Sequence, residues 1–312
     1  MKRILVTGGA GYIGSTVVHM LIDKGYEVVI VDNMSNGDPK LVHEKAKLYV
    51  ADLVDFEELS KVFKNNKFDA VIHIAGYKAV AESMKDPAKY TDNITSTLNI
   101  LKLMVEYKIK KLIYSSSAAV YGEVDDLITE ETPTKPCNFY GQTKLTSEKI
   151  IKWYNQLGFV DYTIFRYFNV VGNYLKNYID ENPNNVLPIL LEAVIGKKKF
   201  KIFGKTYNTT DGTCIRDYVD VGDLGAVHII ALDKPQNQVY NVTTGVGTSV
   251  LEIVRATEKA LNVKIDFEYA SKREGDPDKL LASGEKLRVD YKWKPEVKLS
   301  DSIIDMYSAY SE

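Results

Sequence analysis

Cysteine is almost missing from this chain of 312 residues, which contains two. Two thiols cannot build a disulfide scaffold, so Cys137 and Cys214 are expected to be reduced thiols of a cytoplasmic protein. Histidine is also scarce, and the four histidines lie far apart, without the spacing of metal ligands. We therefore expect no metal site.

An excess of charge of either sign is missing as well. The chain has 40 Lys and Arg residues against 42 Asp and Glu residues, so its formal net charge is -2. Nucleic-acid-binding proteins usually show a basic surplus. No run reaches the roughly 18 apolar residues of a membrane-spanning helix. These absences predict a protein with neither a nucleic-acid partner nor a membrane segment.

What the first half of the chain does contain is an alternation of short apolar runs and longer amphipathic segments. The runs are rich in β-branched residues and apolar on both faces, as in strands buried in a parallel sheet. This alternation predicts an α/β fold with a Rossmann-type, doubly wound parallel sheet. The predicted strands lie at 4–6, 28–31, 47–50, 70–74, 112–114 and 162–165.

The pattern loosens after about residue 170, which indicates a second domain. A turn cluster at 182–185 precedes an expected helix at 186–195, and short strands and helices follow. We predict a Rossmann domain over 1–171, with a return segment near 220–245, and a smaller α/β substrate-binding domain over 172–312.

A glycine-rich loop follows the first predicted strand. Residues 7–14 read TGGAGYIG, which contains Gly-x-Gly-x-x-Gly and opens a predicted helix. That is the context in which the motif binds a dinucleotide. The glycines let the backbone approach a pyrophosphate, and the helix N-terminus offers N–H groups to it. Taken alone, the glycine triplet could be a tight turn and nothing more.

Asp32 strengthens the dinucleotide interpretation. It follows the second predicted strand, 18 residues beyond Gly14. A carboxylate there accepts hydrogen bonds from the adenosine ribose and repels a 2′-phosphate. Asn33, and not an arginine, comes next, so the sequence predicts NAD and not NADP. Asp52 and Leu53 are placed to meet the adenine, with a plain helix N-cap as the alternative for Asp52.

Tyr140 and Lys144 form the candidate catalytic pair. They are four residues apart, so on a helix they share one face, and Lys144 is expected to lower the pKa of the phenol towards neutrality. Ser117 ends a hydroxyl run, 115–117, at the carboxyl edge where such sheets bind ligands. Together the three side chains predict a hydride-transfer site. An ordinary strand-end turn is the alternative interpretation of 115–117.

Beyond these motifs, the chain resembles the UDP-glucose 4-epimerases of the extended short-chain dehydrogenase/reductase family. The matching stretches run in order over nearly the whole chain. They are TGGAGYIGS at 7–15, DN at 32–33, AV at 79–80, ES at 82–83, SSSAAVYG at 115–122, YGQTK at 140–144, RYFN at 166–169, PNN at 183–185, DGT at 211–213, RDY at 216–218 and REGD at 273–276.

The resemblance implies NAD as cofactor and a UDP-sugar as substrate. The implied cofactor contacts are Gly8, Gly11, Tyr12, Ile13, Gly14, Asp32, Asn33, Asn36, Asp52, Leu53, Ala75, Lys78, Asn93, Tyr140, Lys144 and Phe168. The implied substrate contacts are Ser117, Tyr140, Asn169, Asn185, Phe203 near the uracil, Arg216 and Arg273 facing the diphosphate, Tyr218, Asp276 and Leu280. Surface ion pairing is the alternative for the two arginines.

The implied reaction inverts C4 of the sugar. Tyr140 takes the 4-hydroxyl proton, the C4 hydride passes to NAD, the 4-keto sugar turns, and the hydride returns to the other face. Two rivals are a nucleotide-sugar 4,6-dehydratase and a non-catalytic NAD-sensing protein. Ala118 and Ala119 stand where dehydratases usually carry an Asp-Glu pair, and a sensor would be expected to lose Tyr140 or Lys144.

Two further expectations follow from the resemblance. Leu280 falls where the family has a residue lining the sugar pocket, which predicts activity on N-acetylated UDP-sugars as well; the alternative is that Leu280 packs into the core. Family members are commonly homodimers joined by two helices from each subunit. Here these would be the helix ending near Tyr107 and the helix carrying Tyr140.

Overall fold

The structure is a computed structural model that describes residues 1–124, 126–180, 183, 185–272 and 277–311. The chain forms two compact units. Unit 1 contains Met1–Gly122, Pro133–Tyr167 and Gly225–Tyr240, and unit 2 contains Glu123–Thr132, Phe168–Leu224 and Asn241–Glu312.

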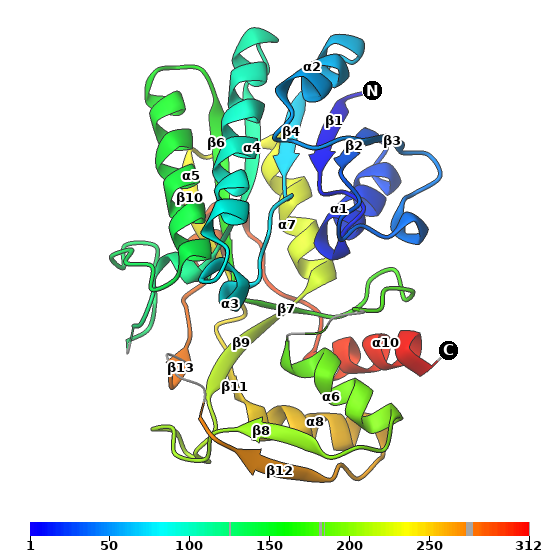
Figure 1. Cartoon of the computed structure of the whole chain (residues 1–312), viewed down its shortest axis with the longest axis vertical. Helices are drawn as coiled ribbons and strands as arrows, with labels where there is room; N and C mark the ends of the chain where they lie inside the picture. The colour runs from blue at the N-terminus through cyan, green and yellow to red at the C-terminus, as the bar shows by residue number, and fades with distance from the viewer. Residues whose placement is uncertain (125, 181–182, 184, 273–276, 312) are drawn as a thin grey trace. The chain divides into compact units, whose positions relative to one another are not determined.

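A parallel sheet forms the centre of unit 1 (Figure 1). Among the described residues, its strands lie in the order β10-β6-β5-β4-β1-β2-β3, and the neighbours from β3 to β6 pair in parallel. The order 3-2-1-4-5-6 is that of the Rossmann fold, so the predicted fold class is confirmed. The strands are Arg3–Thr7 (β1), Glu27–Asp32 (β2), Lys47–Val50 (β3), Ala70–His73 (β4), Lys111–Ser117 (β5), Asp161–Tyr167 (β6) and Gln238–Val242 (β10).

Helices cover both faces of this sheet, which explains why its strands are apolar on both sides. On one face α2, α4 and α5 enclose a hydrophobic cluster with alternate strand residues such as Leu5, Val71 and Leu112. The intervening residues face the other way, where α1 packs on β1 and β2 and contacts α7. The helices are Tyr12–Asp23 (α1), Phe56–Asn65 (α2), Val80–Ser83 (α3), Pro87–Glu106 (α4), Phe139–Gln156 (α5) and Val221–Asp233 (α7), with 3-10 turns at Pro39–Leu41 and Ala118–Val120.

Unit 2 is organised around β9 (Ile215–Asp220). Strand β9 pairs in parallel with β7 (Asn169–Val171) and β13 (Lys279–Leu280), and antiparallel with β11 (Gly247–Ser249). Strands β8 (Phe200–Phe203) and β12 (Phe267–Ala270) form a separate parallel pair.

The helices of unit 2 enclose a second hydrophobic cluster, to which α6, α8 and α10 contribute. A capping box of Ser249 and Glu252 starts α8. The helix predicted at 186–195 is confirmed as α6. The helices are Val186–Ile195 (α6), Val250–Leu261 (α8), Glu285–Tyr291 (α9) and Leu299–Ser311 (α10).

Within the described ranges, no helix combines the length and the apolar character needed to span a bilayer. The same residues contain no group of three or more His, Cys, Asp or Glu side chains that could hold a metal ion.

Candidate active site

The predicted catalytic residues meet where α5 crosses the end of β5. Asn138 starts α5 by accepting the Gly141 N–H at 2.8 Å. One turn apart on this helix, Tyr140 hydrogen-bonds to the side chain of Ser117, and the Nζ of Lys144 donates to the Ser115 carbonyl at 2.8 Å. The structure therefore brings together Ser117, Tyr140 and Lys144, as the sequence predicts.

Burial controls the protonation of both α5 side chains. It lowers the pKa of the Lys144 ammonium to about 8, although the Glu148 carboxylate acts in the opposite direction. Burial also raises the pKa of the Tyr140 phenol, and the hydrogen bond from Ser117 offsets this only in part. The predicted lowering of the Tyr140 pKa is therefore wrong for the chain alone, because desolvation of the phenol outweighs the hydrogen bond from Ser117.

The glycine-rich loop turns back over the end of β1. Gly8 has a φ of +71°, and a Cβ there would lie 2.8 Å from the backbone of Ala75. At Gly14 a Cβ would lie 1.9 Å from the Gly8 carbonyl oxygen. Gly11 is different, because a Cβ there would approach within 4 Å only the Gly8 oxygen, at 3.5 Å. Its missing side chain therefore leaves space beside the N-terminus of α1.

The same end of α1 has no side-chain cap from its own chain, since Gly11 is the N-cap residue. Space and a helix N-terminus together fit the pyrophosphate of a dinucleotide. Tyr12 and Ile13, two further predicted cofactor residues, begin this helix.

Asp32 ends β2 with its carboxylate turned to the glycine-rich loop. Its Oδ2 accepts the Ala10 N–H at 3.0 Å, and its Oδ1 accepts the Met34 N–H at 3.0 Å. The predicted neighbour Asn36 follows in the same connection. At Gly37 a Cβ would approach the Asp32 Oδ1 to 3.0 Å. The position of Asp32 fits the predicted contact with an adenosine ribose.

Asp52 lies next to this corner and does not cap a helix. Its Oδ2 accepts from the Asn33 side chain at 3.2 Å, and its Oδ1 accepts the Val54 N–H at 3.0 Å. The N-cap of α2 is Asp55, which accepts two backbone N–H groups. The N-cap alternative for Asp52 is therefore wrong. Leu53 is buried in the hydrophobic cluster of unit 1.

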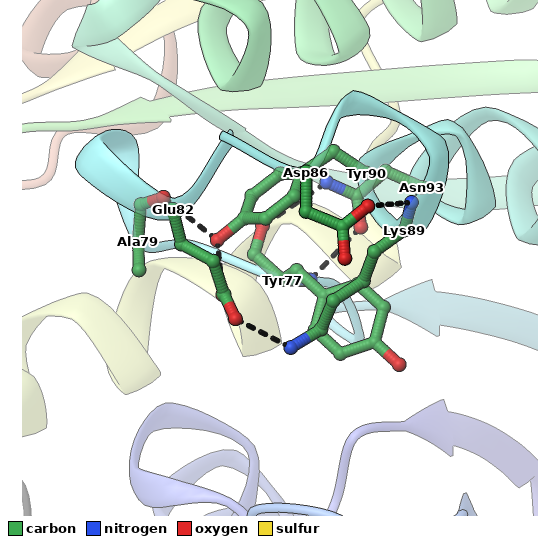
Figure 2. Close-up of polar contacts among 7 residues, drawn as sticks. All are labelled: Tyr77, Ala79, Glu82, Asp86, Lys89, Tyr90 and Asn93. Carbon is green, nitrogen blue, oxygen red and sulfur yellow. Dashed lines mark hydrogen bonds and ion pairs between the residues drawn. The ribbon is translucent and has the colours of Figure 1, made fainter. Parts of the chain in front are cut away.

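Residues 74–86, which we call the strap, follow β4, contain α3 and lead to α4. Asn93 of α4 holds the start of the strap, because its Oδ1 accepts the Tyr77 N–H at 2.8 Å and its Nδ2 donates to the Tyr77 carbonyl at 3.0 Å (Figure 2). Asn93 is thus engaged by the chain itself, and its contact with a cofactor stays a prediction. Ala75 lies at the end of β4 beside the glycine-rich loop, and Lys78 is exposed.

The other end of the strap is held by a buried phenol. Figure 2 shows the Tyr90 hydroxyl between the Ala79 carbonyl at 2.7 Å and the Glu82 carboxylate at 2.9 Å. Glu82 also accepts from Lys89 at 2.7 Å. Directly after Glu82, the Ser83 hydroxyl accepts the backbone N–H of Tyr140 at 3.1 Å. The strap therefore helps to fix the first turn of α5.

Strand β9 gathers predicted substrate residues in unit 2. Arg216 and Tyr218 are two positions apart, so they share one side of the strand. Tyr218 is paired with Asn169 of β7, and Arg216 is paired with Leu280 of β13. The Arg216 Nη1 donates to the Ile215 carbonyl at 2.7 Å. Asn169, Arg216, Tyr218 and Leu280 are therefore brought together through one strand.

The remaining predicted residues lie at the ends of other elements. Asn185 is the N-cap residue of α6, yet its side chain makes no capping hydrogen bond. Phe203 ends β8 with an exposed side chain, and Phe168 lies between β6 and β7. Arg273 and Asp276 lie outside the described residues.

Leu280 is partly buried and does not belong to the hydrophobic cluster of unit 2. This argues against the alternative in which it is a core residue.

Residues 4–243 match the NAD dependent epimerase/dehydratase family. The chain belongs to this family. A UDP-glucose 4-epimerase of Streptococcus mutans is 44% identical to this family member over 313 residues, covering 96% of this chain and 94% of the relative. The resemblance predicted from the motifs is confirmed, and so is an enzyme of the NAD-dependent epimerase type.

Solved structures agree with this family assignment. A crystal structure of a UDP-glucose 4-epimerase has a TM-score of 0.94 and 43% identity, and covers 99% of this chain and 98% of that one. The UDP-glucose 4-epimerase of Bifidobacterium longum, in complex with NAD+ and UDP, has a TM-score of 0.90 and 36% identity, with coverage of 99% and 98%.

Two residues of this epimerase/dehydratase family member receive no role in the sequence analysis. Glu148 and Arg166 form a buried ion pair behind Lys144, with 2.6 Å between Arg166 Nη2 and Glu148 Oε2. The spacing that links Tyr140 to Lys144 also links Lys144 to Glu148, and it is the pattern from which the carboxylate could have been found.

The position of Asp32 predicts the cofactor preference of the protein. Asp32→Ala removes a charged acceptor of ribose hydroxyls, so the affinity for NAD should fall by about 10- to 100-fold. The affinity for NADP should fall less, because the repulsion of the 2′-phosphate also disappears. Titration of the apoprotein with both cofactors measures the ratio of the two dissociation constants.

Asp32 also accepts the Ala10 and Met34 N–H groups, so its removal loosens the backbone around it. This structural effect should lower the affinity for NAD and for NADP by the same factor. Asp23→Ala, at an exposed carboxylate that ends α1, is the matched control. An unchanged NAD:NADP ratio in Asp32→Ala would restrict Asp32 to that structural role.

Proposed function

We propose that the protein is a UDP-glucose 4-epimerase, which interconverts UDP-glucose and UDP-galactose by inverting C4. The observation that carries this proposal is the set of contacts by which Ser117, Tyr140 and Lys144 meet at the end of β5. They lie in the same unit as the glycine-rich loop at 7–14 and Asp32, which fit a dinucleotide. The family assignment and the relatives named above support it.

The chain contributes proton transfer and positioning. Tyr140 would take the proton of the sugar 4-hydroxyl and later return it, while Ser117 would hold the same oxygen by a hydrogen bond. Lys144 is charged below about pH 8, and its charge favours the phenolate over the phenol. Bound NAD would supply a hydride acceptor and donor for C4 and so be regenerated in each turnover.

Inversion also needs a firm hold on the nucleotide and a loose hold on the sugar. The forked donors of Arg216 suit a diphosphate, and Asn169 and Tyr218 lie in the neighbouring positions of the β7–β9 ladder. A 4-keto sugar anchored only through its nucleotide can turn about the diphosphate linkage and present its other face. We propose the cytoplasm as the location, which the two reduced thiols, Cys137 and Cys214, favour.

The reaction itself can be tested with purified protein and no added cofactor. UDP-glucose, UDP-galactose and their N-acetyl forms are assayed side by side, with net epimerisation expected. A 6-deoxy-4-keto product would instead assign the chain to the dehydratases, and the absence of any turnover would favour a sensor.

Replacing the proposed acid–base residue gives the second prediction. Tyr140→Phe should lower kcat by about two to four orders of magnitude, the range for loss of a general acid–base group, while NAD stays bound. Tyr154→Phe on the same helix is the matched control and should keep its activity. Near-normal epimerisation by Tyr140→Phe contradicts the proposed mechanism.

The position of Leu280 supports a second substrate class, the N-acetylated UDP-sugars. Leu280 lies opposite Arg216 in the β9–β13 ladder and remains partly exposed. Leu280→Tyr should suppress turnover of UDP-N-acetylglucosamine and spare UDP-glucose, since a larger ring leaves less room for the 2-substituent. An apolar wall discriminates by about 1–3 kcal/mol, so the expected change is a ratio of roughly 10- to 200-fold.

The matched control for this substitution is Val246→Tyr, which adds a ring at an exposed position of unit 2. Both substrates should be turned over normally by the control. Equal losses on both substrates in Leu280→Tyr, or no loss on either, would show that Leu280 does not select the sugar.

We further propose a homodimer formed through α4 and α5. These helices pack together, and their outer side carries exposed Trp153 and Leu157, with exposed fractions of 63% and 64%. A surface hollow of about 380 Å³ lies between them, lined by Lys102, Val105, Tyr154, Leu157 and Phe159. The end of α5 and the following turn thus expose a concentrated apolar surface. The same face of a second copy of the chain is the partner that would cover it.

Leu157→Glu should convert the dimer to a monomer, because a charge would be buried in an apolar contact. Sedimentation velocity over a concentration series measures the change. Val289→Glu, at an equally exposed valine of α9, is the control and should leave the assembly unchanged. A monomeric parent protein would refute the proposed dimer.

A further inference from the structure

A third side chain continues the row that carries the catalytic pair on α5. Glu148 follows Lys144 by four residues, as Lys144 follows Tyr140, so all three lie on one face of the helix. We propose that Glu148 and its partner Arg166 are a positioning pair, which holds the end of β5 against this row and supplies the counter-charge of Lys144. This inference rests on the proposed function of Tyr140 and Lys144.

Each member of the row contacts a different serine of β5. Tyr140 hydrogen-bonds to the Ser117 side chain, and Lys144 donates to the Ser115 carbonyl. Between them, the Ser116 hydroxyl donates to Glu148 Oε1 at 2.5 Å. The three contacts fix the register between helix and strand, so losing one of them allows Ser117 to shift relative to Tyr140.

Arg166 ties the carboxylate to the next strand. Its Nε donates to Glu148 Oε1 at 2.9 Å and its Nη2 to Oε2 at 2.6 Å, a forked arrangement. In the β5–β6 ladder Arg166 stands directly opposite Ser116. Its guanidinium also lies 4.7 Å from the centre of the Tyr121 ring, just beyond the turn that follows Ser117. The pair therefore joins α5, β5, β6 and that turn.

The burial of the pair argues for a functional reason. The Glu148 and Arg166 side chains are 0% and 3% exposed. A buried ion pair is often replaceable by apolar residues without loss of stability, because desolvation offsets the attraction. Stability alone thus gives little reason for two charges at this place, whereas a neighbouring buried cation and a strand end that must be held in register do.

The electrostatic part concerns the groups that face Lys144. Tyr140 and Glu148 are its neighbours on α5. On β5, the centre of the Tyr114 ring lies 5.1 Å from the Lys144 Nζ. The third element is β4, which contributes His73, and burial lowers the pKa of this imidazole to about 3. Glu148 is the anion in this set, and it opposes the lowering of the Lys144 pKa by burial. Without that carboxylate, Lys144 would lose its proton below pH 8 instead of near it.

The test compares the pH dependence of kcat in the holoenzyme and its variants. In Glu148→Gln, kcat should fall by about 10- to 100-fold, as for a displaced catalytic group, with KM nearly unchanged because the Glu148 side chain is fully buried. The alkaline limb of the profile should move to lower pH by about one unit, since an opposite charge near Lys144 is lost.

A second variant keeps the test valid if the unpaired Arg166 prevents folding. Glu148→Gln with Arg166→Met removes both charges, and its alkaline limb should move in the same direction by a smaller amount. Ser116→Ala removes only the serine contact, so it should lower kcat without moving the limb. Lys149→Gln, an exposed change of charge on the same helix, is the control and should match the parent protein.

A folded double variant with the parent's kcat and an unmoved alkaline limb overturns the proposal. A readout without turnover separates this result from a failure of the proposed function. The ¹³Cε shift of labelled Lys144, assigned with Lys144→Met, should titrate at lower pH in Glu148→Gln even if the protein epimerises nothing. An unchanged titration refutes the counter-charge role, whatever the substrate.

Discussion

The proposed chemistry depends on the contact between α5 and the last three residues of β5. Beyond Tyr114 the strand β5 loses its pairing with β4, while β6 continues beside it as far as Ser117. Here the support comes from a helix face instead, through one hydrogen bond to each serine. The strap adds a further hold at the first turn of the helix. Rigid placement of this kind is what proton transfer over a short distance requires.

The same arrangement sets the charge state of the site. Lys144 and Glu148 are both buried, so each would be costly alone, and the carboxylate is shared with Arg166. The net effect is one ammonium that remains close to its titration point and is sensitive to its neighbours. The phenol of Tyr140 stays protonated in the chain alone, because burial raises its pKa. In the proposed reaction, the positive charge of bound NAD would favour ionisation of this phenol.

Local sequence predicted those parts of the fold that local physics determines. Apolar runs with β-branched residues predicted β1 to β6. Both faces are covered in β1, β2, β4, β5 and β6, whereas the edge strand β3 is partly exposed. Four-residue spacing placed Tyr140 and Lys144 on one face of α5. Local sequence could not predict the raised pKa of Tyr140, because desolvation depends on what packs around the ring. The cap of α2 is by contrast a local feature, since Asp55 directly precedes the helix and accepts N–H groups of its first turn.

In unit 2, the pairing of β9 with β13 places a side chain with oriented hydrogen-bond donors beside an apolar side chain. Arg216 and Leu280 are opposite each other in the β9–β13 ladder, so a forked cation and an aliphatic side chain lie at neighbouring positions. In the proposed reaction the nucleotide must stay bound while the sugar turns. A guanidinium holds a diphosphate through oriented hydrogen bonds, whereas an aliphatic wall favours no single orientation of a hydroxylated ring. A two-residue strand such as β13 carries no hydrophobic periodicity, which is why the sequence alone did not reveal this pairing.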